Sequence, residues 1–370
     1  MAADSSLRSI EVPPPVAPRR MFGRPILEPI SGHAWESHVV LNPAAVLIDD
    51  LAELLALTGI WGLSDSERTR LVRSGGACVM LYRAQGERDE ERGVAPSSIG
   101  MAIFTPELEL VSRRPEPVLL PDAPYHDLGV EDPRCTRVGD RFYLYYTGYG
   151  RNGGSEGRVQ ICLATTSDFV SWEVLGPVAG DLNLYPNKNP ALLSERVNGR
   201  WLMLHRPMEG PDAMTIHLAE APEPSGPWTS LGPLMKSYRY LEFSRSWIGA
   251  GGPPISLGDG RFLMIYHQGH FTVDERREYD LAAALLDFRH EDPVRARIEP
   301  LMRPSGALEV SGDAELGVDN VLFTCANYRF GDRVIIPYAG ADSRIFGAWV
   351  DLGSIVAALE KHATAVESAY

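Results

Sequence analysis

One hairpin pattern recurs along the chain and constrains the fold more than any other feature. In its clearest copies an Asn or Asp precedes a proline, and then come a short apolar run, a glycine-containing turn and a longer apolar-aromatic run. The copies begin at Asn42, Asp132, Asn189, Gly252 and Asp319, the first with an insertion in its turn and the last without the proline. A third run rich in small residues follows each copy, as in "SIGMAIF" and "DLAAALLD".

This repeat predicts the fold class. Five copies of a three- or four-stranded unit are typical of an all-β five-bladed β-propeller, in which each unit forms one blade. A β-sandwich built from many hairpins is the alternative, but it does not require the hairpins to share one pattern. We therefore expect the propeller.

Two segments depart from the repeat, and together with the N-terminus they suggest three parts of the chain. Residues 47–76 have helical spacing and the capping-type sequence "SDSE", so we expect a helical insertion in blade one. The proline-rich polar start predicts a flexible N-terminal arm over residues 1–22. Residues 23–352 would form the catalytic propeller, and residues 353–370 a C-terminal helix that packs on it.

Composition and charge exclude several classes of function. With 44% hydrophobic and 23% charged residues the chain should be globular, and its net charge of -14 disfavours nucleic acid as a partner. Its four cysteines form no CxxC pair, so neither a metal motif nor a disulfide framework is expected. No run resembles a signal peptide or a membrane span, so we expect a cytoplasmic protein that does not contact membranes.

Polar residues gather at one end of the predicted strands. Neighbouring strands of a hairpin are antiparallel, so the start of the first lies beside the end of the second. In a propeller the first strand of each blade lines the central channel, and these ends meet at one mouth. Convergence of acidic and basic side chains there predicts a binding or catalytic site. The residues concerned are Asn42, Arg83, Ser98, Asp132, Lys188, Arg206, His267 and Asp342.

The motifs around these positions resemble those of glycoside hydrolase family 130, the β-mannoside phosphorylases and β-mannosidases. The similarity extends from about Arg24 to about Leu359 and includes "GHAWE", "NPAAV", "LYRA", "GVEDPR", "LMLHRP", "WIGAGGPPI", "YHQG" and "YAGAD" in this order. The family fold is a five-bladed propeller, which agrees with the count of repeats. The chain departs from the usual family pattern at Trp247, at "KNPALL" and at "FTCAN".

The resemblance implies roles for the residues at the mouth. Asp132 of "EDPR" would be the sole catalytic acid, acting with inversion at the anomeric carbon and passing its proton through a sugar hydroxyl. Phosphate would be held by the family's basic positions and a tyrosine, which are here Arg206, His267, Lys188 and Tyr279. The sugar would contact Asn42, Arg83, Ser98 and Asp342. By strand alternation Glu131 should point to the opposite face, where it would form a structural hydrogen bond or pair with an arginine such as Arg134.

These residue types favour phosphorolysis over hydrolysis. An inverting hydrolase needs a second carboxylate as base, whereas phosphate is already an anion and needs cations around it. We therefore expect an inverting glycoside phosphorylase that cleaves β-mannosides with inorganic phosphate as co-substrate, giving mannose 1-phosphate without a metal or organic cofactor. One alternative is an inverting β-mannosidase with Asp342, Asp319 or Glu242 as base, and another is a non-catalytic sugar-binding propeller. The C-terminal helix offers an interface for a homo-oligomer.

Overall fold

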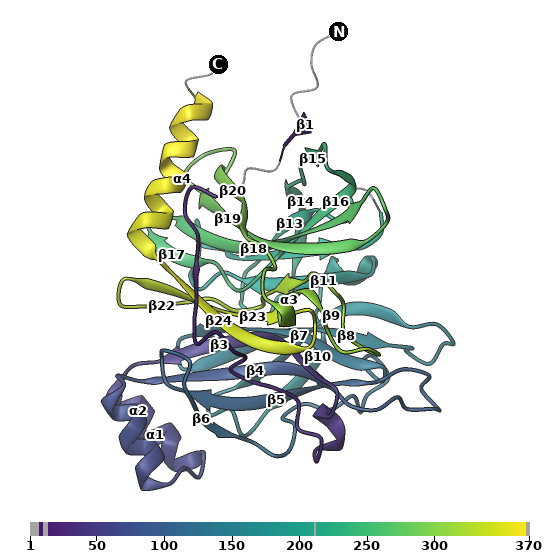
Figure 1. Cartoon of the computed structure of the whole chain (residues 1–370), viewed down its shortest axis with the longest axis vertical. Helices are drawn as coiled ribbons and strands as arrows, with labels where there is room; N and C mark the ends of the chain where they lie inside the picture. The colour runs from purple at the N-terminus through teal and green to yellow at the C-terminus, as the bar shows by residue number, and fades with distance from the viewer. Residues whose placement is uncertain (1–6, 10–13, 211, 368–370) are drawn as a thin grey trace.

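The computed structural model describes residues 7–9, 14–210 and 212–367, and they are built mostly of β-strands (Figure 1). Within this part of the chain no helix has the length and apolar character needed to cross a membrane. All four cysteines are buried and free.

An eight-stranded sheet contains the first two hairpin units. Its strands run in the order β10-β9-β8-β7-β5-β4-β3, and β6 pairs with β5. One parallel pairing, between Ser97 of β5 and Gly129 of β7, joins the two units. The bounds are Val39–Ile48 for β3, Ala77–Gln85 for β4, Ser97–Phe104 for β5, Leu110–Arg113 for β6, Gly129–Val138 for β7, Arg141–Gly150 for β8, Arg158–Thr166 for β9 and Glu173–Pro177 for β10.

The other three hairpin units each have a sheet of their own. The third has β11 (Asn187–Leu192), β12 (Trp201–Pro207), β13 (Ile216–Ala221) and β14 (Thr229–Met235). The fourth has β16 (Phe243–Ala250), β17 (Ile255–Gly258), β18 (Arg261–Thr272), β19 (Arg277–Asp287) and β20 (Val294–Met302). The last has β2 (Arg19–Arg20), β21 (Leu322–Phe323), β22 (Tyr328–Phe330), β23 (Arg333–Gly340) and β24 (Arg344–Asp351), and the short strands β1 (Leu7–Arg8) and β15 (Arg239–Tyr240) pair with each other.

The sheets pack face to face through apolar clusters, which explains why their strands are apolar on both sides. Leu204 of β12 and Met264 of β18 share one cluster, and Leu281 of β19 and Ile336 of β23 share another. Strand β3 contacts β7 on one side and the last sheet, through β23 and β24, on the other. The first and last hairpin units are therefore neighbours in space.

The N-terminal segment completes the last sheet. Strand β2 pairs antiparallel with β24, and Arg20 forms an ion pair of 2.7 Å with Glu309, which is 3% exposed. In the arm predicted over residues 1–22, residues 1–6 and 10–13 lie outside the described part, whereas residues 19 and 20 are held by this pairing.

The helices lie outside the repeating strands. Between β3 and β4 the chain forms α1 (Leu51–Ile60) and α2 (Asp65–Arg73), which begin at the N-caps Asp50 and Ser64. The C-terminal helix α4 (Leu352–Glu367) buries Ile355 in the cluster formed by the last two sheets, and residues 368–370 of the predicted helix are not described. The remaining helices are α3 (Ala307–Val310) and the 3₁₀ turns η1 (Ala34–Glu36) and η2 (Leu182–Leu184).

Candidate active site

Three first strands carry the same local distortion at their polar ends. Asn42, Asp132 and Asn189 have positive φ angles of 48°, 50° and 58°, and at each of them the register with the adjacent strand shifts. Asn and Asp enter this left-handed region more readily than other side chains, and the proline that follows each has no N–H for the ladder. Each Asn-Pro or Asp-Pro pair therefore forms a bulge, which aims a polar side chain out of the strand.

The bulges bring together side chains from separate hairpin units around Asp132. Its Oδ1 accepts a hydrogen bond of 2.7 Å from Asn42 Nδ2 and one of 3.3 Å from Arg83 Nη1. Burial by itself would raise the pKa of the Asp132 carboxyl, but Arg83, Lys188 and Arg134 outweigh burial and hold that pKa at about 2. Without substrate, Asp132 is therefore a carboxylate in a cationic setting.

Glu131 lies in the same site, so the prediction that it points to the opposite face is wrong. Its carboxylate accepts a hydrogen bond of 2.9 Å from Arg83 Nη2 and one of 3.1 Å from Lys188 Nζ. The bulge at Asp132 breaks the alternation on which the prediction rested. Glu131 does pair with an arginine, as one of the two expectations had it, but the partner is Arg83. Arg134 donates instead to the carbonyls of Gly251, Ala250 and Asp132.

Asp342 is the second carboxylate beside Asp132. It has a φ of 47°, and its Oδ1 is buried without a hydrogen-bond partner among the described residues. Burial and the neighbouring Asp132 charge raise the pKa of Asp342 to about 6, although Arg83 opposes the rise. The other two carboxylates considered as a base point elsewhere, since Asp319 accepts from the Gly312 N–H and Glu242 from the Ser9 hydroxyl.

A cationic cavity of about 530 Å³ adjoins this acid pair. Four of its lining residues carry positive charge and none is a carboxylate, although the whole chain has a net charge of -14. The lining residues are Lys188, Arg206, Met208, Met214, Arg245, Ser246, Trp247, Phe271, Arg277 and Tyr279.

Arg206 forms the inner end of the cavity, where its guanidinium contacts the His267 ring. Arg206 is 6% exposed, its Nη1 lies 3.3 Å from His267 Nε2, and its Nε has no partner among the described residues. Burial lowers the pKa of both groups, and Arg206 lowers that of His267 further. His267 is therefore neutral and accepts a hydrogen bond from the guanidinium. A buried guanidinium without a carboxylate partner is costly, so the site is suited to an anion.

Two glycines make room for these side chains. A Cβ at Gly249 would lie 2.4 Å from His267 Nε2 and 2.8 Å from Arg206 Nη1. A Cβ at Gly269 would lie 2.2 Å from the Trp247 ring. Glycine at these positions of β16 and β18 lets Arg206 and Trp247 lie across the sheet.

The structure brings most of the predicted site residues together. Around the acid pair of Asp132 and Asp342 lie Asn42, Arg83 and Lys188. Arg206 and Tyr279 line the cavity together with Lys188, and His267 contacts Arg206. Ser98 does not contact this group. It lines a separate cavity of about 320 Å³ beside Trp35, while its neighbour Ser97 accepts 2.8 Å from Arg83 Nε.

Sequence reasoning missed Arg245 and Arg277 in the cavity lining. Both lie opposite Phe271 in the ladder of β16, β18 and β19, at the end of the sheet where the site lies. Arg206 was predicted because polar residues at one end of the hairpin strands should meet at the channel mouth. The same argument, applied to the first and third strands of the fourth unit, would have identified Arg245 and Arg277.

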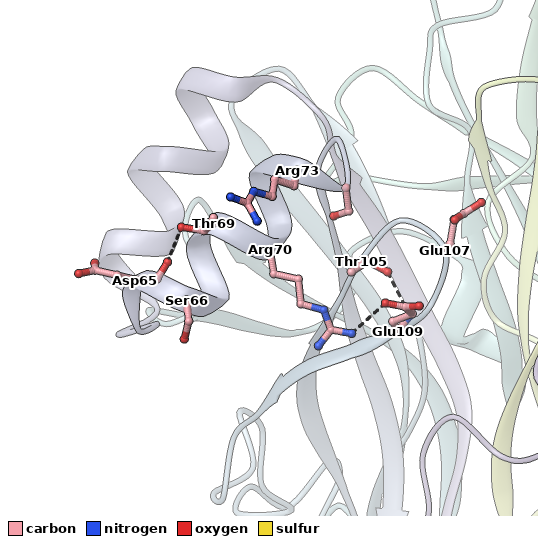
Figure 2. A pocket seen from close by; sticks show the side chains of 9 residues that line it. Asp65, Ser66, Thr69, Arg70, Arg73, Thr105, Glu107 and Glu109 are labelled. Atoms are coloured by element: carbon pink, nitrogen blue, oxygen red, sulfur yellow. Dashed lines mark hydrogen bonds and ion pairs between the residues drawn. The ribbon is translucent and has the colours of Figure 1, made fainter.

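A cavity of about 810 Å³, larger than the cationic one, lies elsewhere. It lies between α2 and the segment that joins β5 to β6, and Arg70 there pairs with Glu109 at 2.9 Å (Figure 2). Its lining mixes both signs of charge on the outer side of the first sheet. Within the described residues, no group of three or more His, Cys, Asp and Glu side chains could hold a metal ion.

Comparison with known proteins identifies close relatives. A family model described as beta-1,4-mannooligosaccharide phosphorylase matches residues 70–361. The beta-1,2-mannobiose phosphorylase of Thermoanaerobacter sp. (strain X514) is 31% identical over 334 residues, which are 88% of this chain and 94% of that protein. The structure of a beta-1,2-mannobiose phosphorylase from Listeria innocua with beta-1,2-mannobiose superposes with a TM-score of 0.69 at 20% identity, covering 93% of this chain and 99% of that one.

A further solved structure is similar in fold. That structure comes from work on glycoside hydrolases of the GH130 family of mannoside phosphorylases that target beta-1,2 mannosidic linkages in Candida mannan. Its TM-score is 0.71 at 21% identity, and the alignment covers 92% of this chain and 96% of the other.

Proposed function

Because the chain belongs to glycoside hydrolase family 130, we propose that it is an inverting β-mannoside phosphorylase, which transfers a mannosyl group to inorganic phosphate. The observation that carries this proposal is the buried Arg206 guanidinium in a cavity without carboxylates, next to the acid pair. A water nucleophile would not offset the desolvation of that charge, whereas a phosphate dianion does so with charge-assisted hydrogen bonds.

The reaction assigns one step to each half of the site. A phosphate oxygen held by Arg206, Lys188 and Tyr279 forms a bond to the anomeric carbon, while the bond from that carbon to the leaving oxygen breaks. Asp132 first takes up a proton from solvent as phosphate and sugar bind, passes it to a hydroxyl of the sugar, and returns to the carboxylate form. The proton of that sugar hydroxyl moves to the leaving oxygen. Phosphate binding would prepare this step, because its negative charge offsets the cations that hold the pKa of Asp132 low.

We also propose that the hairpin units are the five blades of a propeller. Two sets of contacts support such a ring. Strand β3 contacts both β7 and the last sheet, and Arg134 of β7 donates hydrogen bonds to the carbonyls of Ala250 and Gly251 in the fourth unit. In this arrangement residues 23–352 form the catalytic domain. The predicted cytoplasmic location, the absence of a metal or organic cofactor and a homo-oligomer remain proposals.

One experiment tests the activity directly. The protein is incubated with β-1,2- and β-1,4-mannobiose, with and without phosphate, and mannose 1-phosphate and free mannose are measured. The proposal predicts that mannose 1-phosphate forms only when phosphate is present. Release of two mannose molecules at the same rate without phosphate would refute phosphorolysis.

The second candidate is an inverting β-mannosidase, and Asp342 is the observation that favours it. A base should have a pKa near the working pH, and the pKa of Asp342 is about 6. An inverting hydrolase places its base on the face of the sugar opposite the acid. If Asp342 is that base, Asp342→Asn should abolish hydrolysis without phosphate.

A further inference from the structure

The cationic cavity extends well beyond the inner end at Arg206. Two of its four cations, Arg245 and Arg277, are exposed, whereas Arg206 is buried. We propose that Arg245 and Arg277 form an outer anion site at the mouth of the cavity, where the phosphate co-substrate binds before it reaches Arg206. This inference rests on the proposed phosphorolysis, because it concerns the entry of that nucleophile.

The strand register separates the outer site from the inner one. Arg245, Phe271 and Arg277 form one row across β16, β18 and β19. His267, against which Arg206 lies, belongs to a row four residues deeper along β18. At roughly 3.3 Å per residue these rows are about 13 Å apart. The outer arginines therefore start from a backbone row well separated from the row at which Arg206 contacts His267.

Trp247 and Tyr279 occupy the row between the two sites. They face each other across Gly269, with ring centroids 5.5 Å apart, and both line the cavity. These rings carry no charge, so the cations of the cavity fall into two groups along the strands. A dianion entering from solvent would meet the outer arginines first.

The outer arginines have their charge available for an anion. Neither forms an ion pair with a carboxylate within the described part of the chain. Arg245 is held by ring contacts instead, with its Cζ 4.6 Å from the Phe271 centroid and 5.7 Å from the Trp247 centroid. Contact with a ring face positions a guanidinium while its N–H groups stay free to donate.

The outer arginines would help phosphate to approach a negatively charged protein. The chain has a net charge of -14, so its overall field repels phosphate. Unpaired cations at a cavity mouth reverse the field locally and raise the rate of anion capture. Arg277 also links the mouth to the acid pair, because it is one of the cations that oppose the burial-induced rise in the pKa of Asp342.

The test compares Arg245→Gln and Arg277→Gln with the matched control Arg276→Gln. Arg276 is the exposed sequence neighbour of Arg277, so the change in net charge is the same, but its side chain does not line the cavity. Kinetics are measured with saturating mannobiose at a pH well above the value of about 6 for Asp342, so that its ionisation is the same in every variant. Each outer variant should raise the KM for phosphate roughly tenfold with little loss of kcat, and the wild-type dependence of kcat/KM on ionic strength should weaken.

Two results would overturn the outer site. The first is a KM for phosphate that is the same in the outer variants as in Arg276→Gln. The second is a fall in kcat of the outer variants at an unchanged KM for phosphate, which would place the arginines at the reacting phosphate. Calorimetric binding of phosphate to the resting protein separates this inference from the proposed function. If phosphate binds and the outer variants weaken it, but no mannose 1-phosphate forms, only phosphorolysis fails; if wild type binds no phosphate, both fail.

Discussion

At the scale of single residues, the proposed chemistry depends on the Asp132 carboxyl. We expect Asp132→Asn to lower kcat by about 10³-fold, because the amide cannot donate the proton and general acid catalysis contributes roughly 10²- to 10⁴-fold. The affinity for mannobiose, measured by calorimetry, should change little, since the amide oxygen still accepts from Arg83. Asp319→Asn is the matched control, because that carboxylate accepts from the Gly312 N–H and not from Asn42 or Arg83. Near wild-type turnover in Asp132→Asn would exclude Asp132 as the acid.

Asp342 should leave a signature in the pH dependence of stability. Its pKa is about 6 in the folded protein against 3.8 as the ordinary value, so the folded state holds this proton more tightly. The stabilisation is fully present below pH 3.8 and is lost as the pH rises through about 6, by at most about 3 kcal/mol. Urea unfolding of wild type and Asp342→Asn over this pH range measures the effect. Equal slopes in the two proteins would contradict it.

At the scale of elements, the close approach of β16 to β18 positions the inner anion site. Gly249→Ala would push its Cβ against His267 Nε2 and Arg206 Nη1, at 2.4 and 2.8 Å. We expect kcat/KM for phosphate to fall about 100-fold, as it does when catalytic groups are displaced by about 1 Å. Gly59→Ala in α1 is the control, since nothing lies within 4 Å of a Cβ there, and it should leave kcat/KM unchanged. A wild-type value in Gly249→Ala would show that Arg206 and His267 can move without loss.

The elements also show where local patterns succeed and where they fail. The hairpin repeat and the helical spacing of residues 47–76 reflect local periodicity, and strands and helices form there. Glu131 was misplaced because a bulge cancels strand alternation, and the bulge depends on the left-handed φ of Asp132. The recurring Asn-Pro and Asp-Pro pairs were visible in the sequence, but their geometry was not.

At the scale of the whole molecule, β2 joins the N-terminal segment to the last sheet. Arg20→Ala would leave Glu309, 3% exposed, without its cation, and we expect a loss of about 2 to 3 kcal/mol in the free energy of unfolding. Arg19→Ala in the same strand is the control, because it loses only a contact over the Trp349 ring and should cost less than about 1 kcal/mol. Urea denaturation compares them, and equal losses would mean that the Arg20 pair adds nothing.

Sequence patterns were sufficient to predict the repeated β-hairpins, the position of the helical segments and most of the residues that converge on Asp132. These follow from periodicity and from the antiparallel geometry of hairpins, both of which are local. The folded chain was needed to show that Glu131 faces the site, that Ser98 lies apart from it, and that Arg245 and Arg277 line a cavity without carboxylates. The reason is physical: whether a side chain shares a site depends on bulges, on glycines that permit close approach, and on how separate sheets pack, and none of these is encoded within a single strand.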